Sequence, residues 1–599
     1  MRKRAEAFFA LITVLLIFIL PTFAEVAQNS EEAEAPPTRK YVELSIKGPL
    51  VDTKPAFAFG PTGKTLRSLI AQIDRIRKDD EVVGVLLKIE SLGIGWAKLQ
   101  EIRDKLIQLR GDGKVVVSYL KGGGNAEYML ACATDRIVLM PAGTIGVTGL
   151  RAEVMFFKGT FEKLDIEADM MSVGKYKSAI EPYTRDNMSD AQREAINDIL
   201  DDLYEQQVQM IADGRDAIDE ATAKQLIDRG PFTAQEALDA KLADALQYYD
   251  ELVKSLESDQ PEPVKVVSGS SKRSSQPPDL TNFTGFMKFF SMLTTPKRTR
   301  TRSGKPQIAL IYATGPILAD MPSSLFAPQE VITPRKFTKA LRDARKSSTI
   351  RAVVMRVDSP GGSAIASDLI WREVMLTQRE KPVIVSMSDI AGSGGYYIAM
   401  AAGTIVAEPG TITGSIGVLG GKLNLKGLYN KVGLTKEIVK RGNNATLYSD
   451  YGKFTPSERE RVQKMLDTIY WDFVGKAAKG RRKTAEEIHE LAQGRIWTGR
   501  QAKTIGLVDE LGGLETAFAL AKKQIGLSAD DKVNVIVLPK PKTFLETLME
   551  DLDGGATIQV TPDLSIPVAL AKTVPHFYWI HLLATERVVA ALPFALTIR

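Results

Sequence analysis

An internal duplication constrains this chain more than any other feature of its sequence. Residues 82–91 align with residues 350–359 at an offset of 268, and this offset persists without a gap as far as Pro141 and Pro409. After a three-residue insertion in the second copy, the matching register resumes. A repeat of this length predicts two copies of one structural unit rather than several unrelated domains. We place the two copies at residues 41–255 and 306–525.

Each copy alternates short β-branched runs with longer stretches of helical spacing. In the second copy, residues 352–357 and 383–386 are runs of the first kind, and residues 364–376 have the helical spacing. This alternation predicts βαβ units, in which helices cover a mostly parallel sheet. We therefore expect an α/β protein formed by tandem duplication. Residues 256–305 have the composition of a linker, and residues 526–599 form an extension to which the pattern assigns no role.

The first 24 residues have the pattern of a membrane segment. Three basic residues, Arg2 to Arg4, precede an apolar run through Ala24 in which Glu6 is the only charged residue. Such a run predicts a single membrane-spanning anchor with its basic end in the cytoplasm. A removable signal peptide is the alternative, because residues 22–24 form an imperfect small-residue cleavage pattern. Residues 25–40 are expected to be a spacer that places the body outside the cytoplasm.

The composition excludes several kinds of chemistry. The 599 residues include one cysteine, Cys132, so no intrachain disulfide is possible, and a cysteine-based metal site is not expected. A net charge of +5, from 78 basic and 73 acidic side chains, gives no overall field that favours nucleic acid. With only three histidines in the chain, we expect a hydrolase of this sequence to use another general base, unless one of the three lies beside a nucleophile. We expect no cofactor and no metal.

The two copies differ where chemistry is expected. The second copy has DSPGGS at residues 358–363, whereas the aligned ESLGIG at residues 90–95 lacks the double glycine. The second copy also has AGSGGYY at residues 391–397, and in the aligned GGNAEYM at residues 123–129 an asparagine replaces the serine between glycines. A serine between glycines, at the start of an apolar helical stretch, suits an exposed nucleophile, and this serine is Ser393. Amides of the Pro-Gly-Gly loop, with the amide of Gly394, would stabilise an oxyanion. A Gly-Ser-Gly loop without chemistry is the alternative.

Together with TGSIGV at residues 413–418 and the duplication, these motifs resemble the long, two-copy signal peptide peptidases of serine peptidase family S49. The resemblance covers roughly residues 40–530 and implies a fold similar to Clp protease and crotonase subunits. It implies a serine endopeptidase that degrades cleaved signal peptides and other hydrophobic peptides through an acyl-enzyme. It also implies a homotetramer, held by its anchor on the periplasmic side of a bacterial inner membrane.

The family's base is a lysine in a Tyr-Lys-Ser-Ala-x-Glu-Pro motif, which corresponds to YKSAIEP at residues 176–182. The resemblance therefore makes Lys177 the base and Ser415 the serine that orients its amine. For the oxyanion hole we choose Gly362 with the Gly394 amide. A lysine amine can accept the serine proton if its pKa falls from about 10.4 toward 7, as burial would cause.

The copies are complementary in these residues. The second-copy residue aligned with Lys177 is Ala445, and the first-copy residue aligned with Ser393 is Asn125. Each copy thus retains one member of the pair, which predicts one composite site. Two other functions stay open: an acyl-CoA enzyme of crotonase type that uses carboxylates such as Glu90 and Glu127, and a non-catalytic membrane scaffold built from a degenerate duplication.

Overall fold

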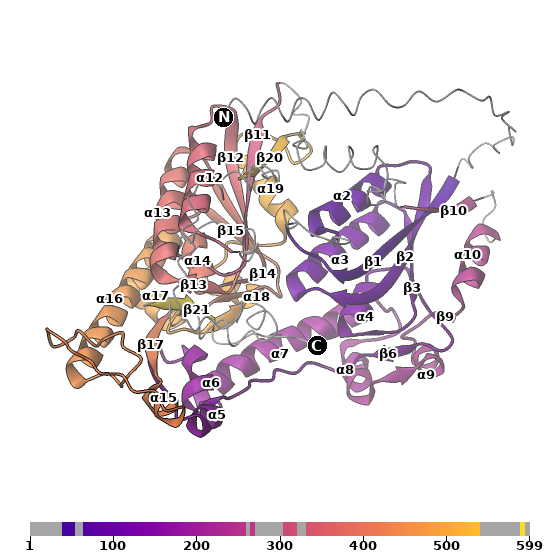
Figure 1. The fold of residues 1–599 in the computed structure, drawn as a ribbon. Helices are drawn as coiled ribbons and strands as arrows, with labels where there is room; N and C mark the ends of the chain where they lie inside the picture. Colours follow the sequence, from indigo (N-terminus) through magenta and orange to yellow (C-terminus); the bar gives the residue numbers. More distant parts are fainter. Residues whose placement is uncertain are drawn as a thin grey trace, which may run out of the picture. The chain divides into compact units, whose positions relative to one another are not determined.

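The computed structural model describes residues 39–53, 64–258, 264–269, 304–319, 331–539 and 588–592. The predicted anchor at residues 1–24 lies outside these ranges. Within the described ranges, we find no helix of the length and apolarity needed to cross a membrane. Two sheets, one parallel and one mostly parallel, form the body of the chain, and helices cover both faces of each (Figure 1).

The first copy is built on a six-stranded parallel sheet. Its strand order is β10-β1-β2-β3-β5-β9. Central strands have consecutive apolar residues, such as 85–87 of β2, because helices bury both faces. Val85 and Leu87 point toward α2 and α3, whereas Leu86 packs with Leu252 of α10 on the other face. The strands of this sheet are β1 (Arg39–Pro49), β2 (Val82–Gly93), β3 (Val115–Leu120), β5 (Arg136–Leu139), β9 (Ala245–Leu246) and β10 (Val264–Ser268).

Further elements of the first copy surround this sheet. A small sheet of order β4-β6-β8 consists of Gly123–Gly124, Thr144–Gly146 and Phe232–Thr233. The α-helices are α2 (Leu66–Arg77), α3 (Trp96–Gly111), α4 (Asn125–Ala131), α5 (Lys158–Lys163), α6 (Glu181–Thr184), α7 (Asp190–Asp213), α8 (Glu220–Arg229), α9 (Ala234–Asp239) and α10 (Tyr249–Ser258).

The second copy repeats this plan with an eight-stranded sheet. The main path is β18-β16-β14-β12-β11-β20, and β15 and β19 extend it beside β14. Val353 and Met355 face the cluster that contains α12, α13 and α16, while Val354 packs with Ala517 of α19. The strands are β11 (Gln307–Thr314), β12 (Ile350–Ser359), β14 (Val383–Gly392), β15 (Thr404–Ala407), β16 (Ile412–Gly414), β18 (Ile496–Thr498), β19 (Glu510–Leu511) and β20 (Asn534–Leu538).

The corresponding strands begin at aligned residues, β2 at Val82 and β12 at Ile350, so the predicted α/β class and tandem duplication are confirmed. The α-helices of the second copy are α12 (Pro334–Lys346), α13 (Ala364–Glu380), α14 (Gly394–Ala399), α15 (Lys426–Lys431), α16 (Pro456–Arg481), α17 (Ala485–Leu491), α18 (Gly499–Thr504) and α19 (Leu514–Gln524).

Three strands lie where the sequence predicted no element. β10 falls within the range assigned to the linker and adds to the edge of the first sheet beside β1. β20 and β21 (Val589–Ala591) fall within the C-terminal extension, and β20 adds to the second sheet beside β11. Each is a run of only three to five residues. Runs this short have too little periodicity to be told from a loop.

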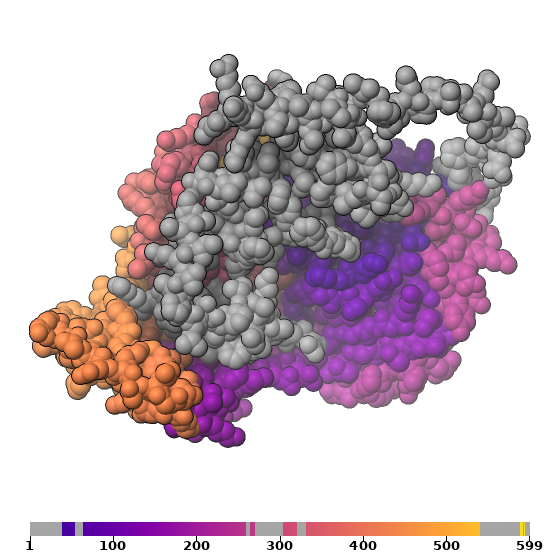
Figure 2. Space-filling view, viewed as in Figure 1, coloured from indigo at the N-terminus to yellow at the C-terminus, as the bar shows by residue number. Residues whose placement is uncertain are grey.

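A third sheet joins the copies. Its order is β13-β21-β17-β7, in which β13 (Gly361–Ser363) and β17 (Val418–Asn424) belong to the second copy and β7 (Glu167–Val173) to the first. β7 and β17 pair antiparallel along seven residues. Beside them, Lys431 Nζ donates to the carbonyl of its aligned counterpart Lys163 at 2.7 Å. Figure 2 shows the two segments meeting at the surface, coloured orange and purple.

We predict that this junction is sensitive to volume at Gly421. A Cβ there would lie 2.6 Å from both the Asp169 carbonyl oxygen and the Met170 Cα, which are backbone atoms that cannot yield easily. Gly421→Ala should lower the free energy of unfolding by about 1–3 kcal/mol, measured by chemical denaturation. Gly475→Ala is the control, because nothing lies within 4 Å of a Cβ in that part of α16. It should be neutral or stabilise by up to about 1 kcal/mol.

Candidate active site

Ser393 occupies a sharp turn between β14 and α14. Its backbone has φ 54° and ψ −112°, a left-handed conformation that costs a non-glycine residue about 1–3 kcal/mol and is held here by neighbouring structure. The Ser393 amide donates to the Gly414 carbonyl at 2.8 Å. Both flanking glycines are needed for close packing: a Cβ on Gly394 would lie 2.8 Å from Ser367 Oγ, and one on Gly392 would lie 2.4 Å from Leu592.

The expectation that the Ser393 hydroxyl would be exposed is wrong. The residue has no exposed surface. Leu592, in a part of the chain to which the sequence assigned no role, packs beside Gly392, immediately before the serine. Sequence pattern alone contained no information about which distant segment would cover this turn.

Lys177 follows β7 of the first copy and reaches Ser393 of the second. Its Nζ lies 2.8 Å from Ser393 Oγ, although the residues are 216 positions apart in the chain. The same nitrogen lies 2.9 Å from Ser415 Oγ and 3.0 Å from the Ser415 carbonyl oxygen. Burial lowers the pKa of the Lys177 amine well below its ordinary value. The structure thus brings together all three side chains that the sequence selected.

The second copy holds the backbone of the lysine segment closely. The Tyr176 amide donates to the Gln493 carbonyl at 2.7 Å. A Cβ on Gly494 would lie 2.5 Å from the Lys177 nitrogen, so only glycine permits this approach. Ser415 is fixed in turn, because its amide donates to the Arg495 carbonyl at 2.7 Å. Residues 493–495 therefore position the lysine and the serine that accepts its hydrogen bonds.

Gly362 and Gly394, the two residues predicted to form an oxyanion hole, lie next to each other. Gly361 and Gly362 form the start of β13, with φ values of 97° and 152°. A Cβ on Gly362 would lie 1.9 Å from the Ile317 carbonyl oxygen, and one on Gly394 would lie 3.1 Å from the Gly362 nitrogen. The Gly362 and Gly394 amides are therefore close enough to face one small group, which is the arrangement that an oxyanion hole requires.

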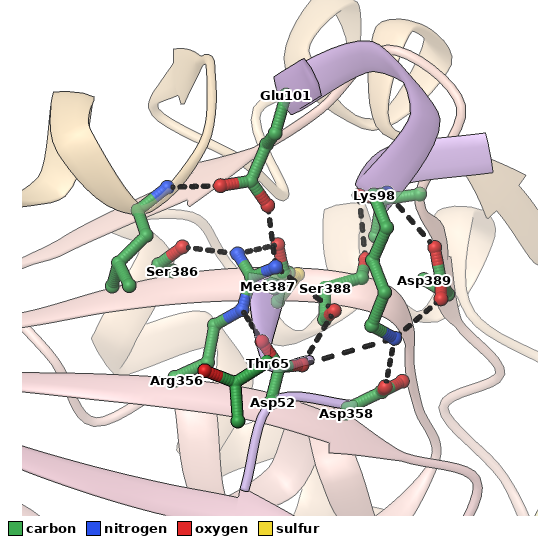
Figure 3. Close-up of polar contacts among 12 residues, drawn as sticks. Asp52, Thr65, Lys98, Glu101, Arg356, Asp358, Ser386, Met387, Ser388 and Asp389 are labelled. Carbon is green, nitrogen blue, oxygen red and sulfur yellow. Dashed lines mark hydrogen bonds and ion pairs between the residues drawn. The ribbon is translucent and has the colours of Figure 1, made fainter. Parts of the chain in front are cut away.

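A buried network of charges, which the sequence analysis missed, underlies this site. Figure 3 shows the Lys98 amine of α3 between Asp358 and Asp389 of the second copy. Lys98 Nζ lies 2.6 Å from Asp358, and the Lys98 amide donates to Asp389 at 3.1 Å. Burial lowers the pKa of Lys98, but Asp389, Asp358 and Asp52 together outweigh it and raise that pKa above its ordinary value. Lys98 is therefore a charged link between the copies.

The same network extends to Arg356, which is completely buried in β12. Its guanidinium pairs with Asp52 at 3.2 Å and with Glu101 of α3, and it donates to Ser388 Oγ at 2.9 Å. The carboxylates come from the first copy, whereas Arg356 and Ser388 come from the second. A sequence signal existed, since Asp358 begins the DSPGGS motif and Asp389 precedes Ser393 by four residues, but nothing in the sequence indicated their partner.

The first-copy residues aligned with the site have structural partners. Asn125, aligned with Ser393, donates to the Gly149 carbonyl at 2.8 Å and accepts from Gln207 at 2.9 Å. The Glu127 carboxylate accepts from the amides of Gly124 and Leu92 at 2.8 and 2.6 Å. Neither side chain is free for chemistry. Among the described residues, no cluster of three or more His, Cys, Asp or Glu could hold a metal ion.

We predict that Lys98 is essential to stability. Lys98→Met leaves the carboxylates of Asp358 and Asp389, each 18% exposed, without their shared partner, which should lower the free energy of unfolding by about 3 kcal/mol. Asp358→Asn in the same chain should recover part of this loss, because it removes one unpaired charge. Lys339→Met is the control: Lys339 is exposed and pairs only with Asp343, so the cost should be below about 0.5 kcal/mol. If urea denaturation gave equal free energies of unfolding for Lys98→Met and Lys339→Met, this result would contradict the role of Lys98.

Comparison with known proteins agrees with this architecture. A family model described as peptidase family S49 matches twice, at residues 108–261 and 375–528. The chain is 35% identical over 507 residues to the chloroplastic serine protease SPPA of Arabidopsis thaliana, covering 83% of this chain and 71% of that protein. It is 31% identical over 553 residues to Protease 4 of Salmonella typhi, covering 88% of this chain and 84% of that protein.

Among solved structures, ClpP1 from Listeria monocytogenes aligns with a TM-score of 0.23 and 16% identity, covering 35% of this chain and 93% of that one. The family match rests on the sequence comparisons, which extend across both copies and most of two relatives. On that basis, the chain belongs to peptidase family S49 and is a serine-type peptidase.

Proposed function

We propose that this peptidase is an endopeptidase with Ser393 as nucleophile and Lys177 as general base. The observation that carries the proposal is the 2.8 Å contact between Lys177 Nζ and Ser393 Oγ, made by two buried side chains from opposite copies. A buried lysine with a lowered pKa holds a lone pair on its nitrogen and can accept a proton. None of the chain's three histidines is needed for this reaction.

The proposed reaction proceeds through an acyl-enzyme. Lys177 accepts the Ser393 proton as Oγ attacks the peptide carbonyl carbon, and its remaining N–H groups donate to Ser415. The Gly362 and Gly394 amides donate to the oxyanion that forms. The Lys177 ammonium then gives its proton to the leaving amine. A water molecule, deprotonated by Lys177, attacks the ester and releases the second product with regeneration of Ser393.

The substrate and the location are also proposals. Resemblance to signal peptide peptidases supports cleaved signal peptides and other hydrophobic peptides as substrates. The basic and apolar N-terminal sequence supports an anchor in a bacterial inner membrane with the body on the periplasmic side, and the family resemblance supports a homotetramer. The acyl-CoA alternative is less favoured, because Glu127, one of its two carboxylates, accepts hydrogen bonds from backbone amides. The scaffold alternative does not explain a buried lysine beside a serine.

We predict that each dyad residue is required for activity. Ser393→Ala and Lys177→Met should each lower kcat for an apolar fluorogenic peptide by about 10⁴-fold or more, because they remove the nucleophile or its base. Ser415→Ala should lower kcat less, because it removes one of two contacts that orient the amine. Peptide hydrolysis is measured for the wild type and for every variant. In parallel, hydrolysis of an acyl-CoA thioester is measured for the wild type.

The control for these variants is Ser528→Ala, which changes an exposed serine and should leave hydrolysis unchanged. Circular dichroism verifies that every variant is folded. Full activity in Lys177→Met would exclude the proposed base. Turnover of the thioester but not the peptide would favour the acyl-CoA alternative, and absence of both in a folded wild-type chain would favour the scaffold.

We also predict the pH dependence of the reaction. Because burial lowers the pKa of Lys177 well below 10.5, the neutral amine forms at a pH well below 10.5. Only this form accepts a proton, so kcat/KM should be low in acid, where Lys177 is protonated. It should rise along one limb as the pH increases and level off before pH 10.5. Lys175→Met is the control, since Lys175 is exposed and pairs with Glu194. Activity that continued to rise beyond pH 10.5 would contradict a buried base.

A further inference from the structure

A short segment near the C-terminus lies inside the candidate active site. β21 pairs antiparallel with β13, which carries Gly362, and on its other side with β17 at Leu419. In this sheet, β21 therefore lies between β13, the predicted oxyanion strand, and the pair β17 and β7, and β7 is the strand that Lys177 follows. The described side chains of the segment are almost completely buried: Val588 is 4% exposed, Val589 1%, Ala590 0% and Leu592 5%.

The register of β21 directs the Ala590 carbonyl toward the Gly362 amide. Gly362 is opposite Ala590 and lies midway between two pairs that are joined by backbone hydrogen bonds. In an antiparallel ladder such bonded pairs recur every second residue, so Gly362 and Ala590 also face each other with their polar groups. The flanking bonds run from the Leu592 amide to the Pro360 carbonyl at 3.0 Å and from the Ala364 amide to the Val588 carbonyl at 3.2 Å.

The other edge of β13 confirms this direction. Ile317 takes the neighbouring polar groups, because its amide donates to the Gly361 carbonyl and its carbonyl accepts from the Ser363 amide, both at 2.8 Å. Since successive residues of a strand point their polar groups to opposite edges, the Gly362 amide is left for β21. This edge is therefore the one at which an added strand meets the predicted oxyanion residue.

The Ala590 carbonyl also lies beside the second predicted oxyanion donor. A Cβ on Gly361 would lie 2.1 Å from the Ala590 oxygen and 2.7 Å from the Gly394 nitrogen, so both atoms border the same side of Gly361. Leu592 continues past the turn that holds Ser393 and packs on Gly392. The segment thus runs as an extended strand along the predicted oxyanion strand, with the Ala590 carbonyl opposite the Gly362 amide and on the side of Gly361 that also borders the Gly394 nitrogen.

We propose that residues 588–592 are an internal ligand of the peptide-binding groove, which a substrate must displace, and that the groove selects a small side chain at the position of Ala590. The size selection follows from packing: Ala590 has no exposed surface and belongs to the apolar core of the second copy, where a larger side chain has no room. The inference rests on the proposed function, because it treats the Gly362 and Gly394 amides as the groups that bind a scissile carbonyl.

The first test expels the segment from the groove of the full-length chain. Ala590→Arg places a charged side chain where there is no space, so the groove should be open in more of the molecules and KM for a short apolar peptide should fall by about tenfold, with kcat little changed. Ala529→Arg is the matched control, because Ala529 is exposed, and its KM should equal that of wild type. An unchanged KM in folded Ala590→Arg would overturn the proposal.

The second test fixes the segment in place and does not depend on disrupting the fold. Leu419 and Val589 are opposite each other on β17 and β21, so cysteines at both positions can form a cross-strand disulfide. With Cys132→Ala in the background, no other thiol is present. Oxidation should abolish peptide hydrolysis, and reduction should restore it. Full hydrolysis by the oxidised, disulfide-bonded chain would overturn the proposal.

A binding measurement separates this inference from the proposed function. A fluorescent, end-blocked peptide of sequence VVAAL is added to full-length Ser393→Ala, with and without Ala590→Arg, and anisotropy is recorded. We expect about tenfold tighter binding when Ala590→Arg is present, and weaker binding of VVRAL than of VVAAL. These results can be obtained even if no variant hydrolyses peptides, in which case the proposed function fails while the groove remains. Equal binding in both chains would refute the internal ligand.

Discussion

The contact between the Lys177 amine and the Ser393 hydroxyl is the interaction around which the candidate active site is arranged, and it requires the two copies to pack together. An ammonium ion is costly to bury, so the burial of Lys177 lowers the pKa of its amine well below the ordinary value. The duplication provides this burial, because the lysine enters from one copy and the second copy closes around it. Residues 493–495 and the Ser415 turn make a close fit that only two packed domains supply.

Other buried basic side chains at the junction of the two copies keep their charge. Lys98 and Arg356 are as deeply buried as Lys177, but each is surrounded by carboxylates and stays charged. Lys98 links Asp358, which leads into the predicted oxyanion strand, to Asp389, which leads into the turn that holds Ser393. The paired charges therefore stabilise this geometry, whereas Lys177 contacts hydroxyl and carbonyl oxygens in place of carboxylates and has a lowered pKa.

The sequence supported many of these conclusions because they depend on local chemistry or on long repeats. The α/β class followed from alternating apolar runs, and the duplication followed from a register maintained over many residues. Ser393 was selected because its glycines permit an unusual turn, and Lys177 through a motif that resembles a family. Three strands were missed, since β10, β20 and β21 are too short to show a period and become recognisable only as additions to an existing sheet edge. The exposure of Ser393 was predicted wrongly because the groups around it come from distant parts of the chain: Lys177 of the first copy contacts its hydroxyl, and Leu592 packs beside the preceding Gly392.

By itself, the sequence determined that one fold occurs twice and that the two copies retain complementary residues. Both properties are matters of residue identity and order. The tertiary structure alone decided that Lys177 contacts Ser393 and that Ala590 lies opposite Gly362. It alone also decided that Lys98 and Arg356 each pair with carboxylates of the other copy. Contacts of this kind join residues that are hundreds of positions apart, and they arise from how two cores pack, which no local pattern records.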